Sequence, residues 1–215
     1  MKPRLKRKLE TIYMKLYRHF GPRHWWPGDT RFEIIVGAIL TQNTNWRNVE
    51  KAIGNLKKKK LLNPVSLYKI PDKKLAALIK PSGYYNIKTK RLKEFIGYLF
   101  KKHGGSLRKM FSQDLHALRH ELLSVKGIGP ETADSILLYA GEKPVFVIDA
   151  YTKRMLLRHR LINKDATYHQ IQELFMNNLN KNVKLFNEYH ALLVELGKTL
   201  CKKKPNCDIC PLKGL

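Results

Sequence analysis

Two glycines separated by one residue and followed at once by a proline are the feature that most restricts how this chain can fold. Gly127, Gly129 and Pro130 follow an apolar lead and precede a strongly helical run. Glycine permits a turn with positive φ and a close approach to the backbone, and proline suits the first turn of a helix. The sequence therefore predicts a helix, a tight turn and a second helix, whose free N–H groups favour an anion, above all a phosphate.

Apolar residues recur at helical spacing through most of the chain. Spacings of three and four residues predict an amphipathic helix over residues 4–20, and Thr30 and Glu33 have the spacing of a capping box for the next helix. The later predicted helices have their apolar residues within 32–40, 49–56, 75–79, 95–100, 115–123, 131–140, 166–178 and 184–200. The run at residues 145–148 is the only plausible strand, and so short a run decides nothing. We predict an all-α protein.

Two cation-rich segments have local interpretations of their own. Four consecutive lysines at residues 57–60 favour a solvated helix end, because four successive residues cannot all face one partner. In the segment of residues 82–92, taken alone, Tyr84 and Tyr85 favour core packing over stacking on a base. The cations of that segment favour a solvated face: Lys88, Lys90 and Arg91.

Composition restricts the partners and the compartment. Lys and Arg number 42 against 17 Asp and Glu, a formal net charge of +25, so the long-range field favours acidic partners. Nucleic acid is the first candidate, and a lysine-rich surface adapted for solubility or heat tolerance is the alternative. The sequence contains no membrane-length apolar run and no secretory stretch, and its three cysteines all follow residue 200. We expect an intracellular protein of the cytoplasm or nucleoid that binds no membrane.

An acidic residue ends the apolar run of residues 145–148 and precedes a basic segment. This residue is Asp149, and Lys153 and Arg154 follow it closely. Its local setting fits either the N-cap of a helix or a carboxylate presented to a bound strand. Asp is a common N-cap, so the local sequence favours the cap.

Together, two segments resemble a pair of motifs from the endonuclease III superfamily of DNA glycosylases. LLSVKGIGPETAD, residues 122–134, is similar to the helix-hairpin-helix, and VIDAYTKR, residues 147–154, is similar to the loop with the catalytic carboxylate. The resemblance implies that Asp149 stabilises an oxocarbenium-like transition state and helps water to attack C1′ of a damaged nucleotide.

The resemblance extends through most of the chain and implies a two-lobed fold with a cleft between the lobes. A six-helix barrel would span residues 28–143, with the helix-hairpin-helix at about 122–141. The N- and C-terminal helices would form the other lobe from residues 1–27 and 144–215, with a cysteine loop at 201–215. The pattern of apolar residues alone supports the helices but not this division.

The resemblance also implies that a monomer binds duplex DNA and flips out a damaged base. Gln42, in the segment AILTQNTNW, matches the glutamine that the family wedges into the gap. The alternative is a polar loop that caps the next helix, where Asn43 or Thr44 would serve equally well. The other residues that we assign to DNA binding are Lys126, Gly127, Gly129, Lys153 and Arg154.

Glu131 stands where bifunctional members of the superfamily carry the lysine that attacks C1′ and forms a Schiff base. A carboxylate cannot do this, so we predict a monofunctional enzyme. The WWP, LTQNT and PSGYYN segments and this glutamate are most similar to the bacterial 3-methyladenine DNA glycosylases. That likeness implies an alkylated purine as substrate and a base pocket that includes Glu131 with Trp25, Pro27 and Trp46. Core packing is the alternative for any tryptophan, and we prefer it for Trp26.

Three cysteines near the end of the sequence resemble part of an iron–sulfur loop. Cys201, Cys207 and Cys210 match the first three ligands of the superfamily's [4Fe–4S] cluster, although the first spacer has five residues where the family has six. The fourth cysteine would fall at position 216, just beyond Leu215. Zinc on three thiolates, or reduced thiols, are the alternatives. The 3-methyladenine relatives lack this cluster, so the chain combines features of two branches.

Two other functions fit the same motifs. One is a pyrimidine or mismatch glycosylase of the endonuclease III type, and the other is a non-catalytic helix-hairpin-helix module that binds DNA through phosphate contacts alone. Asp149 favours an enzyme, because a pure binder gains nothing from a carboxylate near phosphates.

Overall fold

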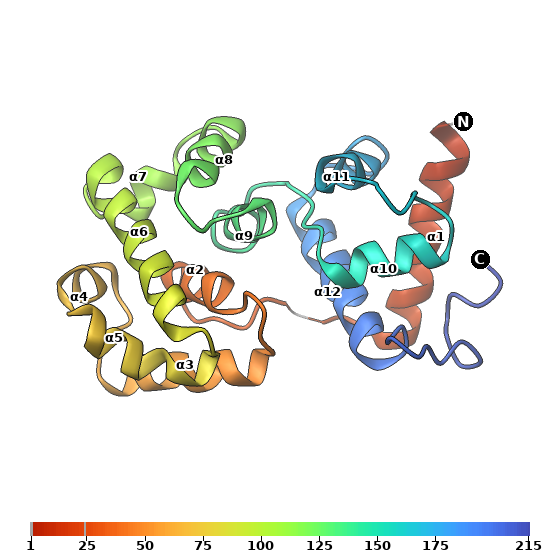
Figure 1. The fold of residues 1–215 in the computed structure, drawn as a ribbon. Helices are drawn as coiled ribbons and strands as arrows, with labels where there is room; N and C mark the ends of the chain where they lie inside the picture. The colour runs from red at the N-terminus through yellow and green to blue at the C-terminus, as the bar shows by residue number, and fades with distance from the viewer. Residues whose placement is uncertain (1, 24) are drawn as a thin grey trace. The chain divides into compact units, whose positions relative to one another are not determined.

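The structure is a computed structural model that describes residues 2–23 and 25–215 as helices joined by loops (Figure 1). The α-helices are α1 (Lys2–Phe20), α2 (Arg31–Leu40), α3 (Trp46–Lys58), α4 (Pro64–Lys69), α5 (Asp72–Ile79), α6 (Tyr85–His103), α7 (Leu107–Phe111), α8 (Leu115–Ser124), α9 (Pro130–Ser135), α10 (Ala150–Arg158), α11 (Tyr168–Met176) and α12 (Val183–Thr199). A 3₁₀ turn, η1 (Lys80–Ser82), and a π-helical turn, η2 (Ile136–Ala140), complete them. Residues 2–23 and 25–215 contain no strand, so the all-α prediction is confirmed.

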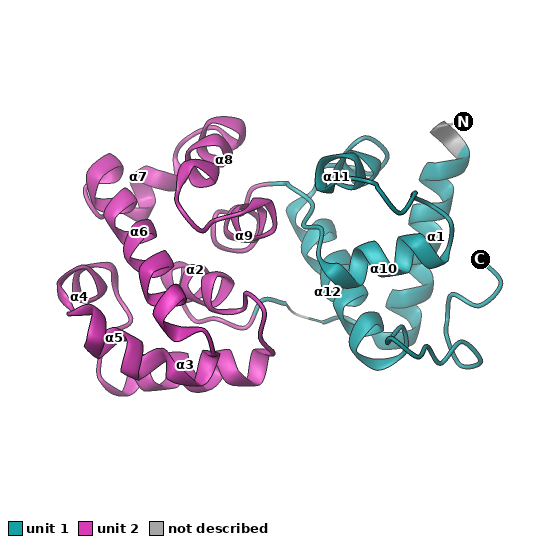
Figure 2. Cartoon of the chain, viewed as in Figure 1, with its two compact units in different colours: residues 1–26, 144–215 teal, residues 27–143 magenta. Residues whose placement is uncertain are grey.

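The chain divides into two compact units (Figure 2). Unit 1 consists of residues 1–26 and 144–215, and unit 2 consists of residues 27–143. In unit 1, α12 packs against both α1 and α10, which joins the two ends of the sequence. In unit 2, α2 packs against α3, α6 and η2. None of the described helices has the length and apolar character needed to cross a bilayer.

A buried extended segment, residues 145–148, lies in the core of unit 1. The ring of Phe146 stacks on that of Phe175 in α11, with centroids 3.9 Å apart. The rings of Phe186 and Tyr189 in α12 meet the Phe146 ring edge to face, with ring centroids 5.3 and 5.6 Å from its own. Aromatic rings bury large apolar areas in such stacked and edge-to-face pairs, so this cluster fixes the segment without a neighbouring strand.

Side chains of α11 supply hydrogen bonds that a neighbouring strand would otherwise provide to this segment. Gln172 donates from Nε2 to the carbonyl oxygen of Phe146 at 2.7 Å. The hydroxyl oxygen of Tyr168 accepts from the backbone N–H of Ile148 at 3.3 Å. Buried backbone polar groups need partners, so these bonds allow an isolated extended segment to run through the core and end at Asp149.

Most predicted helices are present near their predicted positions. Residues 4–20 lie within α1, and the last two predicted helices correspond to α11 and α12. Helices α4 and α7 were not predicted, because helices of 6 and 5 residues are too short to show a helical repeat. The predicted helix at 131–140 differs in its second half, which is the π-helical turn η2. There the N–H of Gly141 donates five residues back, to the carbonyl of Ile136 at 2.9 Å.

The capping box predicted at Thr30 and Glu33 is only half formed. Thr30 Oγ1 accepts from the N–H of Glu33 at 3.1 Å, as predicted. The buried carboxylate of Glu33 instead accepts from the N–H of Asp29 and pairs with Lys57 at 2.7 Å. Lys57 is therefore not simply solvated, and its hydrogen bonds to Asp29 and Glu33 raise its pKa.

Candidate active site

The helix-hairpin-helix motif of unit 2 consists of α8, a turn and α9. The N–H of Ile128 donates to the carbonyl of Val125 at 3.0 Å and closes the turn, and both side chains are buried. Gly127 has φ +90°, and a Cβ there would lie 3.0 Å from Cδ of Arg91. Glycine is therefore required for both the backbone conformation and the space.

The turn presents its polar groups outward. Lys126 and Gly129 are exposed. Gly129 is the N-cap of α9 and supplies no side-chain cap, and Pro130 follows at the first helical position. Uncapped N–H groups at a helix start favour an anion, so this turn has the chemistry that the sequence analysis assigns to it.

Gln42 lies on the loop after α2, and the hairpin holds its side chain. Its Nε2 donates to the carbonyl of Gly127 at 3.1 Å and to Oγ1 of Thr132 at 2.9 Å. Its Oε1 accepts from Arg91. The amide is thus bonded on both sides within unit 2.

The loop after Gln42 also shows which residue caps α3. Asn45, and neither Asn43 nor Thr44, accepts the N–H of Asn48 at 3.1 Å. Asn43 is exposed and has φ +55°. The loop therefore does cap the next helix, as the alternative interpretation held, but the capping residue is Asn45 and neither of the two residues suggested.

In the segment of residues 82–92, Lys90 is exposed as predicted, but the predictions for Tyr84, Lys88 and Arg91 are wrong. Tyr84 is 67% exposed, with φ +46°, and is not a core residue. Lys88 is buried, and its Nζ donates to the carbonyls of Leu40 at 2.8 Å and Ser82 at 2.6 Å. Burial, aided by the nearby charge of Arg91, lowers the pKa of Lys88 to about 8. Lys88 and Arg91 therefore bind the protein itself rather than solvent, because segments far away in the sequence fold onto α6.

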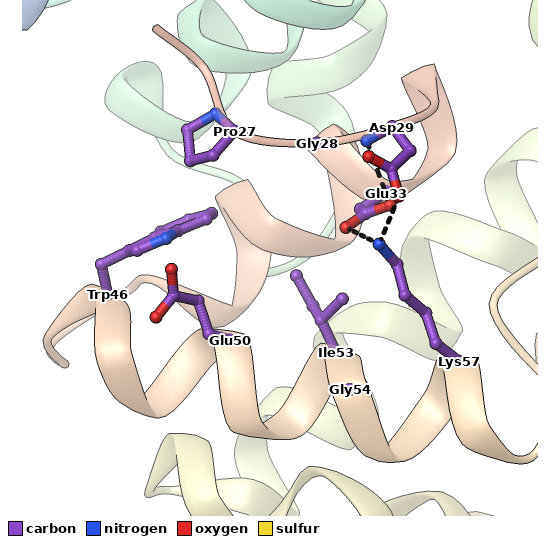
Figure 3. Close-up of a pocket in the computed structure, with 9 residues that line it drawn as sticks. All are labelled: Pro27, Gly28, Asp29, Glu33, Trp46, Glu50, Ile53, Gly54 and Lys57. Atoms are coloured by element: carbon purple, nitrogen blue, oxygen red, sulfur yellow. Dashed lines mark hydrogen bonds and ion pairs between the residues drawn. The ribbon is translucent and has the colours of Figure 1, made fainter.

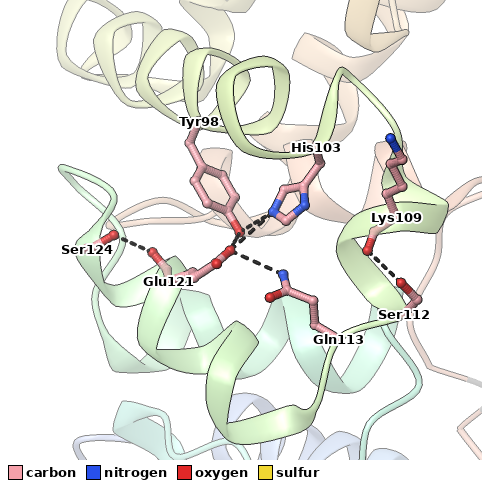
Figure 4. Close-up of polar contacts among 7 residues, drawn as sticks. All are labelled: Tyr98, His103, Lys109, Ser112, Gln113, Glu121 and Ser124. Carbon is pink, nitrogen blue, oxygen red and sulfur yellow. Dashed lines mark hydrogen bonds and ion pairs between the residues drawn. The ribbon is translucent and has the colours of Figure 1, made fainter.

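A polar network holds α8, which leads into the hairpin, against α6 (Figure 4). One carboxylate oxygen of Glu121 accepts from the hydroxyl of Tyr98 at 2.8 Å and from Nε2 of Gln113 at 3.2 Å. Nε2 of His103 lies 3.2 Å from the same oxygen. Three partners on one carboxylate fix the start of the helix-hairpin-helix on unit 2.

Unit 2 contains a pocket of about 340 Å³ next to Trp46 (Figure 3). The predicted residues Pro27 and Trp46 both line it, and Glu50 lies one turn after Trp46 on α3. The other lining residues are Gly28, Asp29, Glu33, Ile53, Gly54 and Lys57. Glu131, on the first turn of α9, is exposed and is not among them.

None of the acidic residues of this pocket was predicted from the sequence as a site residue. A signal existed for Glu50, because residues four apart share one face of a helix and Trp46 was already a candidate. No such signal existed for Asp29 and Glu33, which a loop and a helix cap bring to the pocket. With Lys57, the pocket carries three carboxylates and one ammonium group.

Trp25 and Trp26 belong to unit 1, where both are half-buried. Their rings meet edge to face with centroids 5.5 Å apart. Nζ of Lys198, in α12, lies 5.2 Å from the ring centroid of Trp25, in the range of a cation–π contact.

Asp149 is the N-cap of α10 in unit 1. Its Oδ1 accepts from the N–H of Thr152 at 2.7 Å, and its Oδ2 lies 3.7 Å from Nε2 of His190. Burial lowers the pKa of His190; the charge of Asp149 opposes this, and that of Lys198 adds to it. Burial therefore favours the neutral form of His190 beside this carboxylate. The cap predicted from the local sequence is present, and it leaves one carboxylate oxygen outside the cap bond.

The two cations after Asp149 make hydrogen bonds within unit 1. Nζ of Lys153 donates to the carbonyl of Ala166 at 3.0 Å. Nε of Arg154 donates to the carbonyl of Cys201 at 2.7 Å, and Nη2 donates to that of Gly197 at 3.1 Å. Arg154 thus stabilises the carboxyl end of α12 as well as standing next to the loop of Asp149.

Comparisons with known proteins show the family to which this chain belongs. Residues 36–181 match the model of the HhH-GPD superfamily base excision DNA repair proteins. A Methanocaldococcus jannaschii protein, provisionally named as a DNA repair glycosylase, is 49% identical over 211 residues, which cover 96% of each chain.

Two solved structures share the fold. The 3-methyladenine DNA glycosylase of H. pylori, bound to 1,N6-ethenoadenine, has a TM-score of 0.77 and 30% identity over 90% of this chain and 97% of that one. An endonuclease III–DNA complex has a TM-score of 0.83 at 21% identity, over 96% of this chain and 92% of that one. The chain belongs to the HhH-GPD superfamily of DNA repair glycosylases.

The C-terminal loop of this glycosylase carries the three cysteines. Cys201 is buried, and its sulfur accepts from Nη1 of Arg158 at 3.1 Å. The N–H of Cys210 donates to the carbonyl of Cys207 at 3.3 Å, and burial raises the pKa of the Cys210 thiol. Over the part of the chain that the structure describes, no three His, Cys, Asp or Glu side chains form a group that could hold a metal ion. As arranged here, the three thiols do not fit a metal site by themselves.

Proposed function

We propose that this glycosylase is a monofunctional enzyme that acts as a monomer on duplex DNA and releases alkylated purines, 3-methyladenine first among them. The observation that carries the proposal is the setting of Asp149. Its carboxylate is oriented by the N–H of Thr152 and the start of α10, and His190 lies beside it. A fixed, negatively charged oxygen is what a developing oxocarbenium ion requires.

In the proposed reaction, water attacks C1′ of the flipped nucleotide while the bond from C1′ to the base nitrogen breaks. Asp149 stabilises the positive charge on the sugar and accepts the proton of the water. The bonding electrons leave with the base. A purine methylated at N3 or N7 carries a positive charge in the nucleotide, so it departs neutral and needs no acid. The products are the free base and an abasic site.

The monofunctional assignment rests on Glu131. Its carboxylate stands at the position of the lysine in bifunctional members and cannot form a Schiff base. Gln42, Lys126, Gly127 and Gly129 are proposed to contact the duplex from unit 2. Lys153 and Arg154 are proposed to support the strand beside Asp149.

The substrate assignment rests on the pocket of Trp46. An indole face attracts an electron-poor or cationic ring. Three carboxylates and one ammonium group give this pocket a negative balance in a chain with a net charge of +25. This local reversal of sign favours a cationic methylated purine over a neutral base. Pro27 lines the same pocket. Trp25 and Glu131 do not line it, and their contact with the base is proposed from the family resemblance alone.

Asp149→Asn should abolish base release but keep the fold and DNA binding, because Asn also caps helices and removes a charge that repels phosphate. We expect a fall in the single-turnover rate on the order of a hundredfold or more on methylated duplex DNA. Asp114→Asn is the matched control, since Asp114 caps α8 with the same kind of bond, at 2.7 Å. Near wild-type turnover by Asp149→Asn would show that Asp149 is only a cap.

The wild-type product should contain an intact abasic site until alkali is added, and borohydride should trap no covalent complex. The reason is that the carboxylate of Glu131 cannot attack C1′. Trapping is measured as a protein–DNA band on a denaturing gel, and Glu131→Lys tests whether an amine at this position suffices. Efficient trapping of the wild type would contradict the monofunctional assignment and indicate another lysine, such as Lys126.

Trp46→Ala should reduce the selectivity for methylated purines up to about thirtyfold, since each cation–π contact contributes roughly 0.5–2 kcal/mol. Trp46→Phe is the control that keeps an aromatic face. The measurement compares release of 3-methyladenine and 7-methylguanine with release of uracil, thymine glycol and 8-oxoguanine. If methylated DNA is untouched and one of these three is excised, the endonuclease III type of specificity applies instead. If no base is excised at all, the protein is a non-catalytic module that binds DNA.

We further propose that three of the four ligands of a [4Fe–4S] cluster are Cys201, Cys207 and Cys210. A variant with a cysteine added after Leu215 as the fourth ligand should purify brown, with about four iron and four sulfide ions per molecule. Cys207→Ser should lose the iron and the colour. Colourless protein after anaerobic reconstitution would contradict this proposal and leave zinc or free thiols.

A further inference from the structure

Two cations one turn apart on α6 join segments that are distant in the sequence. Lys88 donates to the last carbonyl of α2, that of Leu40, and to the carbonyl of Ser82. Arg91 donates to Gln42, which follows α2 by two residues. Both cations therefore hold the loop after α2 on the surface of α6.

Arg91 also supports the hairpin directly. Gly127 packs so closely on its side chain that a Cβ at 127 would lie 3.0 Å from Cδ and 3.1 Å from Nε of Arg91. The carbonyl of the same glycine accepts from Nε2 of Gln42 at 3.1 Å. Arg91, Gln42 and Gly127 thus form a closed set of contacts among α6, the loop after α2 and the hairpin turn.

This arrangement fixes the orientation of the Gln42 amide. Its oxygen faces the guanidinium of Arg91, and its nitrogen faces two acceptors on the hairpin and α9, Gly127 and Thr132. Without Arg91 the amide could turn over, and its oxygen would then face the carbonyl of Gly127. The hydrogen bond between the loop and the hairpin therefore depends on the donor on α6.

We propose that Arg91 is a positioning residue, which acts through Gln42 to hold the loop after α2 and the hairpin in one fixed arrangement. The two segments then engage the duplex as a single preformed surface. Preorganisation of this kind increases affinity because less conformational freedom is lost on binding. The inference rests on the proposed contact of both segments with DNA, and it is independent of which base is excised.

A double-mutant cycle tests the proposal. Arg91→Met keeps the hydrophobic stem on Gly127 but removes the donor, and Gln42→Ala removes the amide. Lys90→Met is the matched control, because it removes the same charge from an exposed neighbour on α6. The readout is the Kd for a duplex with an uncleavable abasic-site analogue, measured at two salt concentrations, with the melting temperature of each variant.

We expect Arg91→Met and Gln42→Ala each to weaken binding by about tenfold, because each change removes the link between the loop and the hairpin. Lys90→Met should show only a smaller, salt-dependent loss. The double variant should bind within about twofold of the weaker single variant, because both changes remove the same link. Arg91→Lys, which keeps a donor, should recover part of the affinity. A hundredfold loss in the double variant, or an Arg91→Met effect equal to that of Lys90→Met, would overturn the proposal.

The test separates this proposal from the proposed substrate. Affinity for the abasic analogue requires neither base release nor Asp149. The binding constants of the double-mutant cycle can therefore be measured and interpreted even if the protein does not excise 3-methyladenine. If Arg91→Met lowers the melting temperature strongly, the cycle is measured on Arg91→Leu, which also lacks a donor, Gln42→Ala and their combination instead. Additive losses in that set would overturn the proposal equally.

Discussion

The position of Asp149 depends on the hydrogen bonds that α11 makes to a buried backbone segment. An extended run without a neighbouring strand cannot cross a core unless its polar groups find partners. Gln172 and Tyr168 provide these partners at Phe146 and Ile148. The aromatic cluster around Phe146 then fixes the run, and Asp149 follows it directly as the cap of α10. The placement of the carboxylate thus follows from the core of unit 1 and not from the loop alone.

Charge is distributed unevenly over the protein, and for the proposed function this distribution matters more than the total net charge. The net charge of +25 attracts DNA over a long range. At short range, the pocket of Trp46 has more carboxylates than cations, and the carboxylate of Asp149 lies beside His190, whose neutral form is favoured by burial. A basic surface with locally negative sites suits a polyanion that carries a cationic lesion. The same sites would gain much less from a neutral damaged base.

The sequence predicted features whose cause is local, and it missed those whose cause lies elsewhere in the fold. The turn at Gly127 was predictable because backbone freedom belongs to the residue itself, and the cap at Asp149 was predictable because capping involves residues three apart. Lys88 and Arg91 looked like solvated cations. Their partners, Leu40 and Gln42, are 48 and 49 residues away in the sequence, so no local sequence pattern predicts these contacts.

The proposed substrate and the proposed mode of action support each other chemically. An enzyme without the lyase lysine must rely on water, so it depends on a leaving group that departs easily. A cationic methylated purine is such a group, because it leaves as a neutral base. Two separate effects are proposed. The negative pocket beside Trp46 favours a cationic base in the ground state, and the carboxylate of Asp149 stabilises the positive charge that develops on the sugar. A neutral pyrimidine would gain only the second effect, which is why Glu131 and the pocket together favour an alkylated purine.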